Sequence, residues 1–408
     1  MRTDLCRICK SKDLKVVLDY GNVALADSFI DKTEVYSERK YPLRLCMCLT
    51  CSHIQIDDII DPSILFEHYV WNTGVSKSIV KFAEELYERL ISTYGSFNPN
   101  VLEIACNDGS ILSVFKDNGC EVLGVDPAKN IVEIAQGRGI PALPRFFNLE
   151  TARYVKDNYG LKDVIIARNV LAHVSDLHGL VEGIKLLLAD KGFVSLEFPQ
   201  LKTTFQELQY DQVFHEHIGF HSLDSVIKLF NMYEMEVFDV EELWIHGGSL
   251  RVFVQHNGGP RKVQSSVSRL IEEEIKIGLL SLDSWIDFGL RAQAHAVSLR
   301  SEIERLKDSG QKVIIYGASG KGQSLLQFCG IDKDLIDCVI DKSEMKQGKL
   351  TPGTHIPIYP PSFIEESGAS VILLCAWNFA NEIMEQEGDF ISRGGKFLHP
   401  VPKPHYLN

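Results

Sequence analysis

Three histidines, two carboxylates and a tyrosine lie within twelve positions of this sequence, from Tyr210 to His221. The centre of this cluster is His215-Glu216-His217, which could hold a metal ion, move protons or form a polar loop. It differs from the metalloprotease pattern H-E-x-x-H, in which two histidines one helical turn apart face one zinc ion. In a strand, His215 and His217 would share a face and Glu216 would oppose them. The surrounding elements must decide between these alternatives.

Two C-x-x-C pairs near the N-terminus predict a zinc site. The expected ligands are Cys6, Cys9, Cys48 and Cys51, because four thiolates complete the tetrahedral sulfur set that suits Zn²⁺. Cys46 could replace Cys48, but only Cys48 gives the C-x-x-C spacing. The long intervening segment must carry structure of its own, and "LRLCMCL" alternates as a small sheet would. Four thiolates leave no open coordination position, so we expect zinc to stabilise folding; the alternative is a set of unmetallated buried thiols.

A strand–turn–helix–strand unit in the middle of the chain predicts a nucleotide-type site. The two strands are "VLEIA" (101–105) and "EVLGVD" (121–126), and the turn between them matches the E-x-G-x-x-x-G turn of S-adenosylmethionine enzymes, with alanine at the first glycine position. Such a turn brings a ligand near backbone N–H groups, and an acid after the second strand can bind ribose hydroxyls. The alternative is a ligand-free α/β turn. The predicted cofactor-binding residues are Glu103, Ala105, Asn107, Gly109, Asp126, Pro127 and, past a later strand, Asn169.

A second glycine-rich turn follows in the last quarter of the chain. "VIIY" (313–316) reads as a strand, G-A-S-G-K-G as the turn, and "DCVIDKS" as a second strand that ends at Asp341. We predict that Ser319, Lys321 and Asp341 bind the nucleotide part of a substrate, with a phosphate at the helix N-terminus. The alternative is an α/β domain used only for packing.

Composition narrows the class of partner. The chain has 408 residues, 45% hydrophobic content and a net charge of -13, which argues against binding to a nucleic acid backbone. No apolar run approaches the roughly 18 residues that span a membrane. The start, "MRTDLCRICK", is polar and does not resemble a signal peptide. We therefore expect a cytoplasmic protein that binds neither nucleic acid nor membrane.

These motifs together resemble the sugar C-methyltransferases of deoxysugar biosynthesis. The resemblance runs through the paired C-x-x-C motifs, "LEIACNDGSIL", "RNVLAHVSDLHGLVEGI", "FHEHIGFHSL", "HGGSLRVFV", "IYGASGKGQSLL" and "AWNF". It implies transfer of a methyl group from S-adenosylmethionine to a ring carbon, usually C-3, of a nucleotide-linked 4-keto-6-deoxyhexose through an enolate. The resemblance further implies that the zinc ion lies far from the reacting atoms and that the protein is a monomer or a dimer. By this resemblance, His217 is the general base, Glu216 is the neighbour of His217 in the active site, and His173 is a donor to the keto oxygen.

Two positions depart from the pattern of that family. Phe214 stands where the family often has a tyrosine, and Trp71 aligns with a second active-site tyrosine. Two hydroxyl donors to the enolate are thus missing, for which Tyr69 or Tyr210 could compensate. We assign Tyr69, Trp71, Phe214 and His215 to the substrate site. The alternatives are a keto-sugar nucleotide epimerase or oxidoreductase, disfavoured by the missing G-x-G-x-x-G order, a sugar O-methyltransferase, and a scaffold without catalysis.

The expected architecture is α/β with several domains. We predict a zinc-binding domain at 1–66, a Rossmann-like methyltransferase domain at 67–260, a helical connector at 261–310, and a C-terminal Rossmann-like domain at 311–408 that binds the nucleotide sugar.

Overall fold

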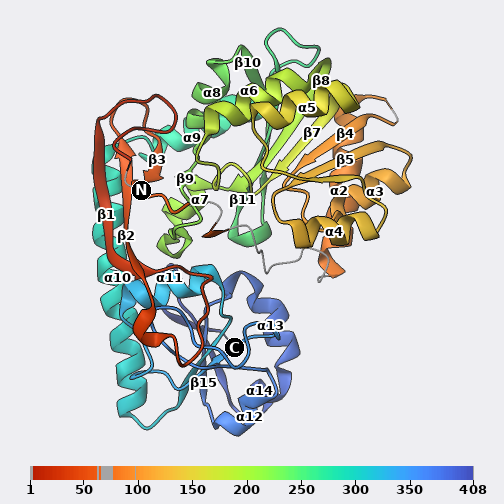
Figure 1. Cartoon of the computed structure of the whole chain (residues 1–408). Coiled ribbons are helices and arrows are strands. Elements are labelled where there is room, and N and C mark those ends of the chain that lie inside the picture. The colour runs from red at the N-terminus through yellow and green to blue at the C-terminus, as the bar shows by residue number, and fades with distance from the viewer. Residues whose placement is uncertain (1–2, 62–63, 66–76, 97, 408) are drawn as a thin grey trace.

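The computed structural model describes residues 3–61, 64–65, 77–96 and 98–407, and three β-sheets organise it (Figure 1). The first sheet has four antiparallel strands in the order β1 (Leu14–Ala24), β2 (Lys40–Cys48), β3 (Ile54–Ile56) and β9 (Gly219–Phe220). β2 contains the predicted strand "LRLCMCL". β9 comes from the middle of the chain, directly after His215-Glu216-His217. The H-E-H segment is therefore attached to the N-terminal sheet.

The second sheet has seven strands in the order β10-β11-β8-β7-β4-β5-β6. The parallel strands are β4 (Asn100–Ile104), β5 (Glu121–Asp126), β6 (Ala142–Pro144), β7 (Lys162–Arg168) and β8 (Leu188–Pro199), and the antiparallel strands are β10 (Met235–Leu243) and β11 (Ser249–His256). The central parallel strands are almost wholly buried, as expected for a sheet with helices on both faces. The order reverses between β4 and β7, where open α/β sheets bind ligands.

Helices cover this second sheet in a Rossmann-like arrangement (Figure 1). They are α2 (Lys77–Tyr94), α3 (Ser110–Asp117), α4 (Lys129–Gly137), α5 (Leu149–Tyr159), α6 (Leu177–Leu187) and α8 (Leu223–Asn231). The short helix α7 (Leu201–Gln206) instead packs Leu201 and Phe205 into the core that contains α10 (Leu282–Asp308). Several begin at a side-chain cap of the expected type, such as Asp176 before α6 and Ser222 before α8.

The third sheet has six strands in the order β14-β13-β12-β15-β16-β17, and only β17 is antiparallel to its neighbour. The strands are β12 (Val313–Tyr316), β13 (Val339–Ile340), β14 (Ile358–Tyr359), β15 (Val371–Leu374), β16 (Lys396–His399) and β17 (His405–Leu407). Its helices are α11 (Gly320–Cys329), α12 (Phe363–Ser367), α13 (Ala380–Gln386) and α14 (Gly388–Ser392). The strands predicted from "VIIY" and "DCVIDKS" both belong to this sheet.

The segment predicted as a connector contains α9 (Ser265–Lys276) and α10 (Leu282–Asp308), and α10 has a central packing role. It runs along β1 and reaches the third sheet (Figure 1). Trp285, Phe288 and Leu299 are fully buried in one core shared by the first sheet, α10 and the third sheet. A Cβ at Gly289 would lie 2.1 Å from the Val17 carbonyl oxygen, so only glycine allows this close approach.

Among the described residues, no helix combines the length and the apolar character needed to cross a bilayer.

Candidate functional site

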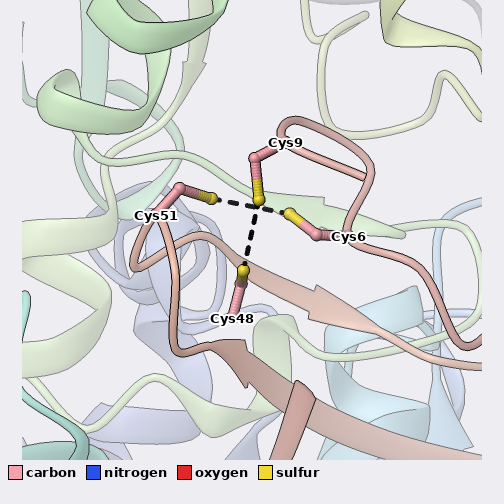
Figure 2. A group of neighbouring side chains, drawn as sticks. All are labelled: Cys6, Cys9, Cys48 and Cys51. Atoms are coloured by element: carbon pink, nitrogen blue, oxygen red, sulfur yellow. Dashed lines mark hydrogen bonds between the residues drawn. The ribbon is translucent and has the colours of Figure 1, made fainter. Parts of the chain in front are cut away.

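Four cysteine sulfurs form a compact cluster at one end of the first sheet, as Figure 2 shows. Cys6 Sγ lies 3.5 Å from Cys51 Sγ, Cys9 Sγ lies 3.5 Å from Cys48 Sγ, and all four lie within 4.8 Å of one another. Four sulfurs each about 2.3 Å from one zinc ion would be separated by distances in this range. The thiolate set therefore fits a structural zinc ion. Cys46 does not belong to the cluster.

The two C-x-x-C loops have the same backbone form. The N–H of Lys10 donates to the carbonyl of Cys6, and the N–H of Ser52 donates to the carbonyl of Cys48. Both Lys10 and Ser52 have a positive φ, 60° and 64°, which reverses the chain just after the second cysteine of each pair. This equivalence explains why the spacing alone picked out, among five nearby cysteines, the four whose sulfurs gather.

The predicted cofactor turn after β4 has an unusual backbone. Ala105 (φ 56°), Asn107 (φ 51°) and Gly109 (φ 74°) are all left-handed, and so is Asn169 (φ 52°) after the neighbouring β7. Left-handed conformations cost non-glycine residues roughly 1–2 kcal/mol each, and such strain concentrates at ligand sites. The four residues lie at the carboxyl ends of β4 and β7, where the strand order reverses.

Two buried acids flank this turn. The carboxylate of Asp126 accepts the N–H of Asn107 at 2.9 Å and that of Ala128 at 2.9 Å, so it is fixed beside Pro127 at the end of β5. Glu103 is 2% exposed, and its Oε2 has no hydrogen-bond partner among the described residues. Burial raises the pKa of Glu103 to about 8, although Arg168 opposes that effect. A buried carboxylate oxygen without a partner fits a cationic ligand such as S-adenosylmethionine.

The H-E-H segment is a turn, and its three side chains point to different parts of the molecule. His215 Nε2 lies 3.1 Å from the carbonyl of Pro42 in β2. Glu216 meets Asp27, which follows β1. His217 Nδ1 lies 2.8 Å from the carbonyl of Gln212. The two histidines therefore do not share a face, and among the described residues only the four cysteines form a group able to hold a metal.

His217 and His173 form a pair of neutral imidazoles. Their ring centroids lie 4.9 Å apart, and His173 Nδ1 lies 2.8 Å from the carbonyl of Glu216. Because a carbonyl only accepts hydrogen bonds, each Nδ1 carries a proton and each Nε2 is an acceptor. Burial lowers the pKa of His173 to about 4. Burial also lowers the pKa of His217 well below its usual value, and the nearby His173 and Lys321 lower the pKa of His217 further. His217 is thus unprotonated at neutral pH.

The glycine-rich turn of the third sheet approaches His217 from the other side. The Phe214 ring lies against His217, with centroids 4.1 Å apart and the ring planes tilted by 35°, and a Cβ at Gly320 would lie 3.3 Å from Phe214. Lys321 Nζ lies 4.8 Å from the centre of the Trp377 ring, and burial lowers its pKa to about 8. The H-E-H segment and the third sheet thus meet at His217.

The other substrate residues predicted in this turn have structural partners. Ser319 caps α11 by accepting the N–H of Gly322 at 3.2 Å. The carboxylate of Asp341 accepts the N–H of Ala318 at 2.7 Å and that of Ser343 at 2.8 Å. Asp341 therefore holds the second glycine-rich turn as Asp126 holds the first.

Three of the sequence-based suggestions concern aromatic residues. Tyr69 and Trp71 lie outside the described residues. Tyr210 is fully buried, and its hydroxyl contacts His295 Nδ1 at 2.8 Å and Cys329 Sγ at 3.3 Å. The suggestion that Tyr210 compensates for the missing hydroxyls was therefore wrong, because its hydroxyl is used in the core.

Several charged residues near the site were given no role from the sequence, although Asp211 was counted in the cluster around H-E-H. Asp27 and Lys346 surround Glu216, and Asp211 accepts the Nε1–H of Trp377 at 2.6 Å. Each comes from a segment distant in the sequence from the group it contacts, and none belongs to a motif with known spacing.

Three family models match this chain. Residues 6–66 match a family model described as "Putative zinc binding domain", residues 79–239 one described as "Methyltransferase domain", and residues 244–402 one described as "C-methyltransferase C-terminal domain". The PH0226 protein from Pyrococcus horikoshii OT3 is 16% identical with a TM-score of 0.38, covering 49% of this chain and 100% of that one. Magnesium protoporphyrin IX methyltransferase (ChlM) from Synechocystis PCC 6803, solved with bound SAM, is 15% identical with a TM-score of 0.33, covering 44% of this chain and 79% of that one.

The full-length relative is more informative. C-methyltransferase NovU of Streptomyces niveus is 31% identical over 407 residues, which make up 99% of this chain and 97% of NovU. The chain therefore belongs to the S-adenosylmethionine-dependent C-methyltransferases that carry an N-terminal zinc-binding domain.

Proposed function

We propose that this enzyme methylates C-3 of a nucleotide-linked 4-keto-6-deoxyhexose through an enolate, with His217 as the base. The observation that carries the proposal is the state of His217. Its Nδ1–H is held by the Gln212 carbonyl, and Nε2 has no partner among the described residues. A hydrogen next to a ketone is a weak acid, so its removal needs a base that is positioned and unprotonated.

The proposed reaction balances with groups of this chain. The C-3–H bond breaks, its proton goes to His217 Nε2, and the electron pair moves toward the oxygen at C-4. The carbon then takes the methyl group that S-adenosylmethionine supplies as an electrophile. The Nδ1–H of His173 is used by the Glu216 carbonyl, so His173 could donate to the keto oxygen only if its Nε2 were also protonated. The lowered pKa of His173 disfavours that protonated form. The role of His173 is therefore to orient the His217 ring rather than to act as an acid.

We assign the cofactor to the residues around the first turn and the nucleotide to those around the second. Glu103, Asn107, Gly109, Asp126 and Asn169 would hold the cofactor at the strand ends of the second sheet. Lys321 would face a phosphate of the substrate at the start of α11, because a helix N-terminus and an ammonium group both attract anions. We retain 1–66, 67–260, 261–310 and 311–408 as the proposed domain limits.

Product analysis tests the proposal. The enzyme is incubated with S-adenosylmethionine carrying a ¹³C-methyl group and a panel of nucleotide-linked 4-keto-6-deoxyhexoses, and the product is examined by carbon NMR. A methyl signal coupled to a ring carbon supports C-methylation, whereas the shift of a methyl ether would indicate the O-methyltransferase alternative.

A matched pair of variants tests the base. His217→Asn should lose most of the methyl transfer and, with S-adenosylhomocysteine bound, most of the exchange of deuterium from solvent into C-3. His256→Asn is the control, because the hydrogen bond of the His256 ring goes to the Leu188 carbonyl at 3.2 Å, at the end of β11 away from H-E-H. Full activity of His217→Asn would refute the assignment.

A further inference from the structure

One arginine links the zinc-binding loop to the segment that carries the proposed base. Arg7 is the second residue of the first C-x-x-C pair, and it is 4% exposed. Its Nη1 donates to the carbonyl of Ile218 at 2.9 Å and to the carbonyl of Ile56 in β3 at 2.8 Å. Ile218 directly follows His217 in the chain. The guanidinium group therefore holds the backbone one residue past the proposed base.

The backbone of Ile218 is held from two directions. Its N–H donates to the carbonyl of Ala172 at 2.8 Å, and Ala172 directly precedes His173. Its carbonyl accepts the N–H of Ile56 at 3.1 Å in addition to the Nη1–H of Arg7. The two paired imidazoles have ring centroids 4.9 Å apart, so their relative position depends on how the two segments that carry them are joined. Ile218 is one of the points at which these segments are joined.

The loop that carries Arg7 is itself fixed on its neighbours. The backbone N–H of Arg7 donates to Gln55 Oε1 at 2.8 Å, and Gln55 Nε2 donates to the carbonyl of Leu5 at 3.1 Å. His178 Nε2, in α6, lies 2.9 Å from the carbonyl of Ile8. Ile8 is 1% exposed, and its side chain belongs to the buried core of the second sheet. The zinc-binding loop is therefore packed against the methyltransferase sheet and its helices.

Stability alone does not account for an arginine at this position. Its Nε and Nη2 are buried and have no hydrogen-bond partner among the described residues. Burial of a charged group with unmet donors costs free energy, and an apolar side chain of similar volume is often as stable or more so. Four thiolates outweigh the charge of one Zn²⁺, so a loaded site would attract the guanidinium and offset part of this cost. In return, the guanidinium group makes two carbonyl contacts, and one of them lies beside the base.

We propose that Arg7 is a positioning residue for His217, through which the zinc-binding loop acts on methyl transfer. This inference rests on the proposed function, because it concerns the residue assigned as the base. Closing the two C-x-x-C loops on one metal ion fixes the backbone from which Arg7 extends, and Arg7 Nη1 fixes the carbonyl of Ile218. The His217 ring then keeps the orientation in which its Nδ1–H meets the Gln212 carbonyl at 2.8 Å.

The kinetics of two variants test this role. Arg7→Met removes the donors, and Arg7→Lys keeps the charge on a shorter side chain that cannot hold both carbonyls at these distances. A displacement of about 1 Å can cost about 100-fold in rate, so kcat of Arg7→Met should fall by at least about 10-fold, with KM and the affinity for S-adenosylhomocysteine little changed. The loss in Arg7→Lys should be smaller. Leu49→Met is the matched control, because Leu49 is the second residue of the other C-x-x-C pair and is 45% exposed.

The ring nitrogens of His217 give a second readout that needs no substrate. ¹⁵N NMR of the ligand-free wild type should show the Nδ1–H tautomer for this ring, assigned by comparison with His217→Asn. Arg7→Met should show a mixture of tautomers, whereas Leu49→Met should match the wild type. A colorimetric chelator should find the same zinc content in all these proteins, because each retains the four cysteines.

Unchanged kcat or unchanged His217 ring signals in Arg7→Met would overturn the proposal. Loss of zinc from this variant would also overturn it, because the effect would then lie in the metal site and not in the guanidinium group. If Arg7→Met does not fold, Arg7→Lys decides by the same measurements. Failure of the proposed function is a separate result: the wild-type enzyme would make no C-methylated sugar, while the ring signals would still test the link between Arg7 and His217.

Discussion

Glu103→Gln should stabilise the ligand-free protein and weaken the binding of S-adenosylmethionine. Glu103 is 2% exposed, and burial raises its pKa from 4.5 to about 8, with Asp126, Asp108 and Glu197 adding to the effect. Because the folded state binds this proton more tightly than the unfolded chain does, the free energy of unfolding falls as pH rises from about 4.5 to about 8 and then levels.

The size of this loss follows from the two pKa values. Their difference corresponds to on the order of 5 kcal/mol above pH 8, at about 1.4 kcal/mol for each factor of ten. Glutamine cannot ionise and avoids this cost, although its amide would lose roughly 1–3 kcal/mol for unmet hydrogen bonds. We therefore expect Glu103→Gln to unfold at a higher denaturant concentration than the wild type at pH 8, and at a lower one at pH 4.5, where only the cost of the amide remains.

Cofactor binding should show the opposite effect. A carboxyl group with a pKa of about 8 is roughly nine-tenths protonated at pH 7, so a cation that needs the ionised form must displace about 0.9 proton. Between pH 6 and pH 8 the affinity should rise by about 50-fold. Isothermal titration calorimetry in two buffers of different ionisation enthalpy measures the proton release directly. Glu103→Gln should release none, and Glu133→Gln, at an exposed position of α4, should match the wild type.

Equal affinities of the wild type at pH 6 and pH 8, without proton release, would refute this reasoning. They would mean that Glu103 is already ionised in the ligand-free enzyme, and that Arg168 offsets burial more fully than the geometry indicates.

Three further predictions concern stability. Cys48→Ser should unfold the N-terminal segment and release zinc, as measured by a colorimetric chelator, whereas Cys46→Ser should retain the metal because Cys46 lies outside the sulfur cluster. Ala105→Gly should raise the free energy of unfolding by about 0.5–1 kcal/mol in a denaturant titration. Glycine relieves the strain of a left-handed φ of 56°, and the greater conformational entropy of glycine in the unfolded chain cancels only part of this gain. Tyr210→Phe should lower stability by roughly 1–3 kcal/mol, because it leaves His295 without its hydroxyl partner, and should leave kcat unchanged.

Much of the fold could be predicted from local patterns. The apolar runs at 101–105, 121–126 and 313–316 each became a buried parallel strand, because such strands need only a continuous hydrophobic segment and a turn on either side. The zinc ligands could be identified for a similar reason, since each C-x-x-C pair lies in one turn. These features depend on neighbours within a few residues.

What the sequence did not reveal depends on contacts between distant segments. β9 joins the N-terminal sheet through Ile54 and Phe220, and Asp27 meets Glu216; neither pairing has a local signal. The predicted connector is helical as expected. The role of α10 in the shared core could not be predicted, because it depends on which face of α10 is buried, and that face is set by the position of β1. The H-E-H segment could not be assigned to a turn from its letters, and that turn is why its histidines diverge.

A last prediction concerns how the C-terminal part of the chain controls the base. Trp377 belongs to the short helix η5 (Trp377–Phe379), and its Nε1–H donates to Asp211 Oδ2 at 2.6 Å. Asp211 is fully buried, and its Oδ1 has no partner among the described residues. The next residue is Gln212, whose carbonyl holds the His217 Nδ1–H at 2.8 Å. Trp377 therefore acts on His217 through two adjacent residues.

Trp377→Phe removes the side-chain donor, so the buried Asp211 carboxylate keeps only the backbone N–H groups of Asp211 and Gln212 and the charge of Lys321. The carboxyl group would then take up a proton or shift, and the carbonyl that fixes the His217 tautomer would move with it. We expect kcat to fall by about 10-fold or more, since roughly 1–3 kcal/mol of hydrogen bonding is lost at a positioning contact, while the affinity for S-adenosylhomocysteine stays unchanged. Phe379→Leu, in the same helix, is the control, because Phe379 is 46% exposed. If Trp377→Phe and Phe379→Leu have the same kcat, the tautomer of His217 does not depend on Asp211, and the C-terminal part of the chain acts only through substrate binding.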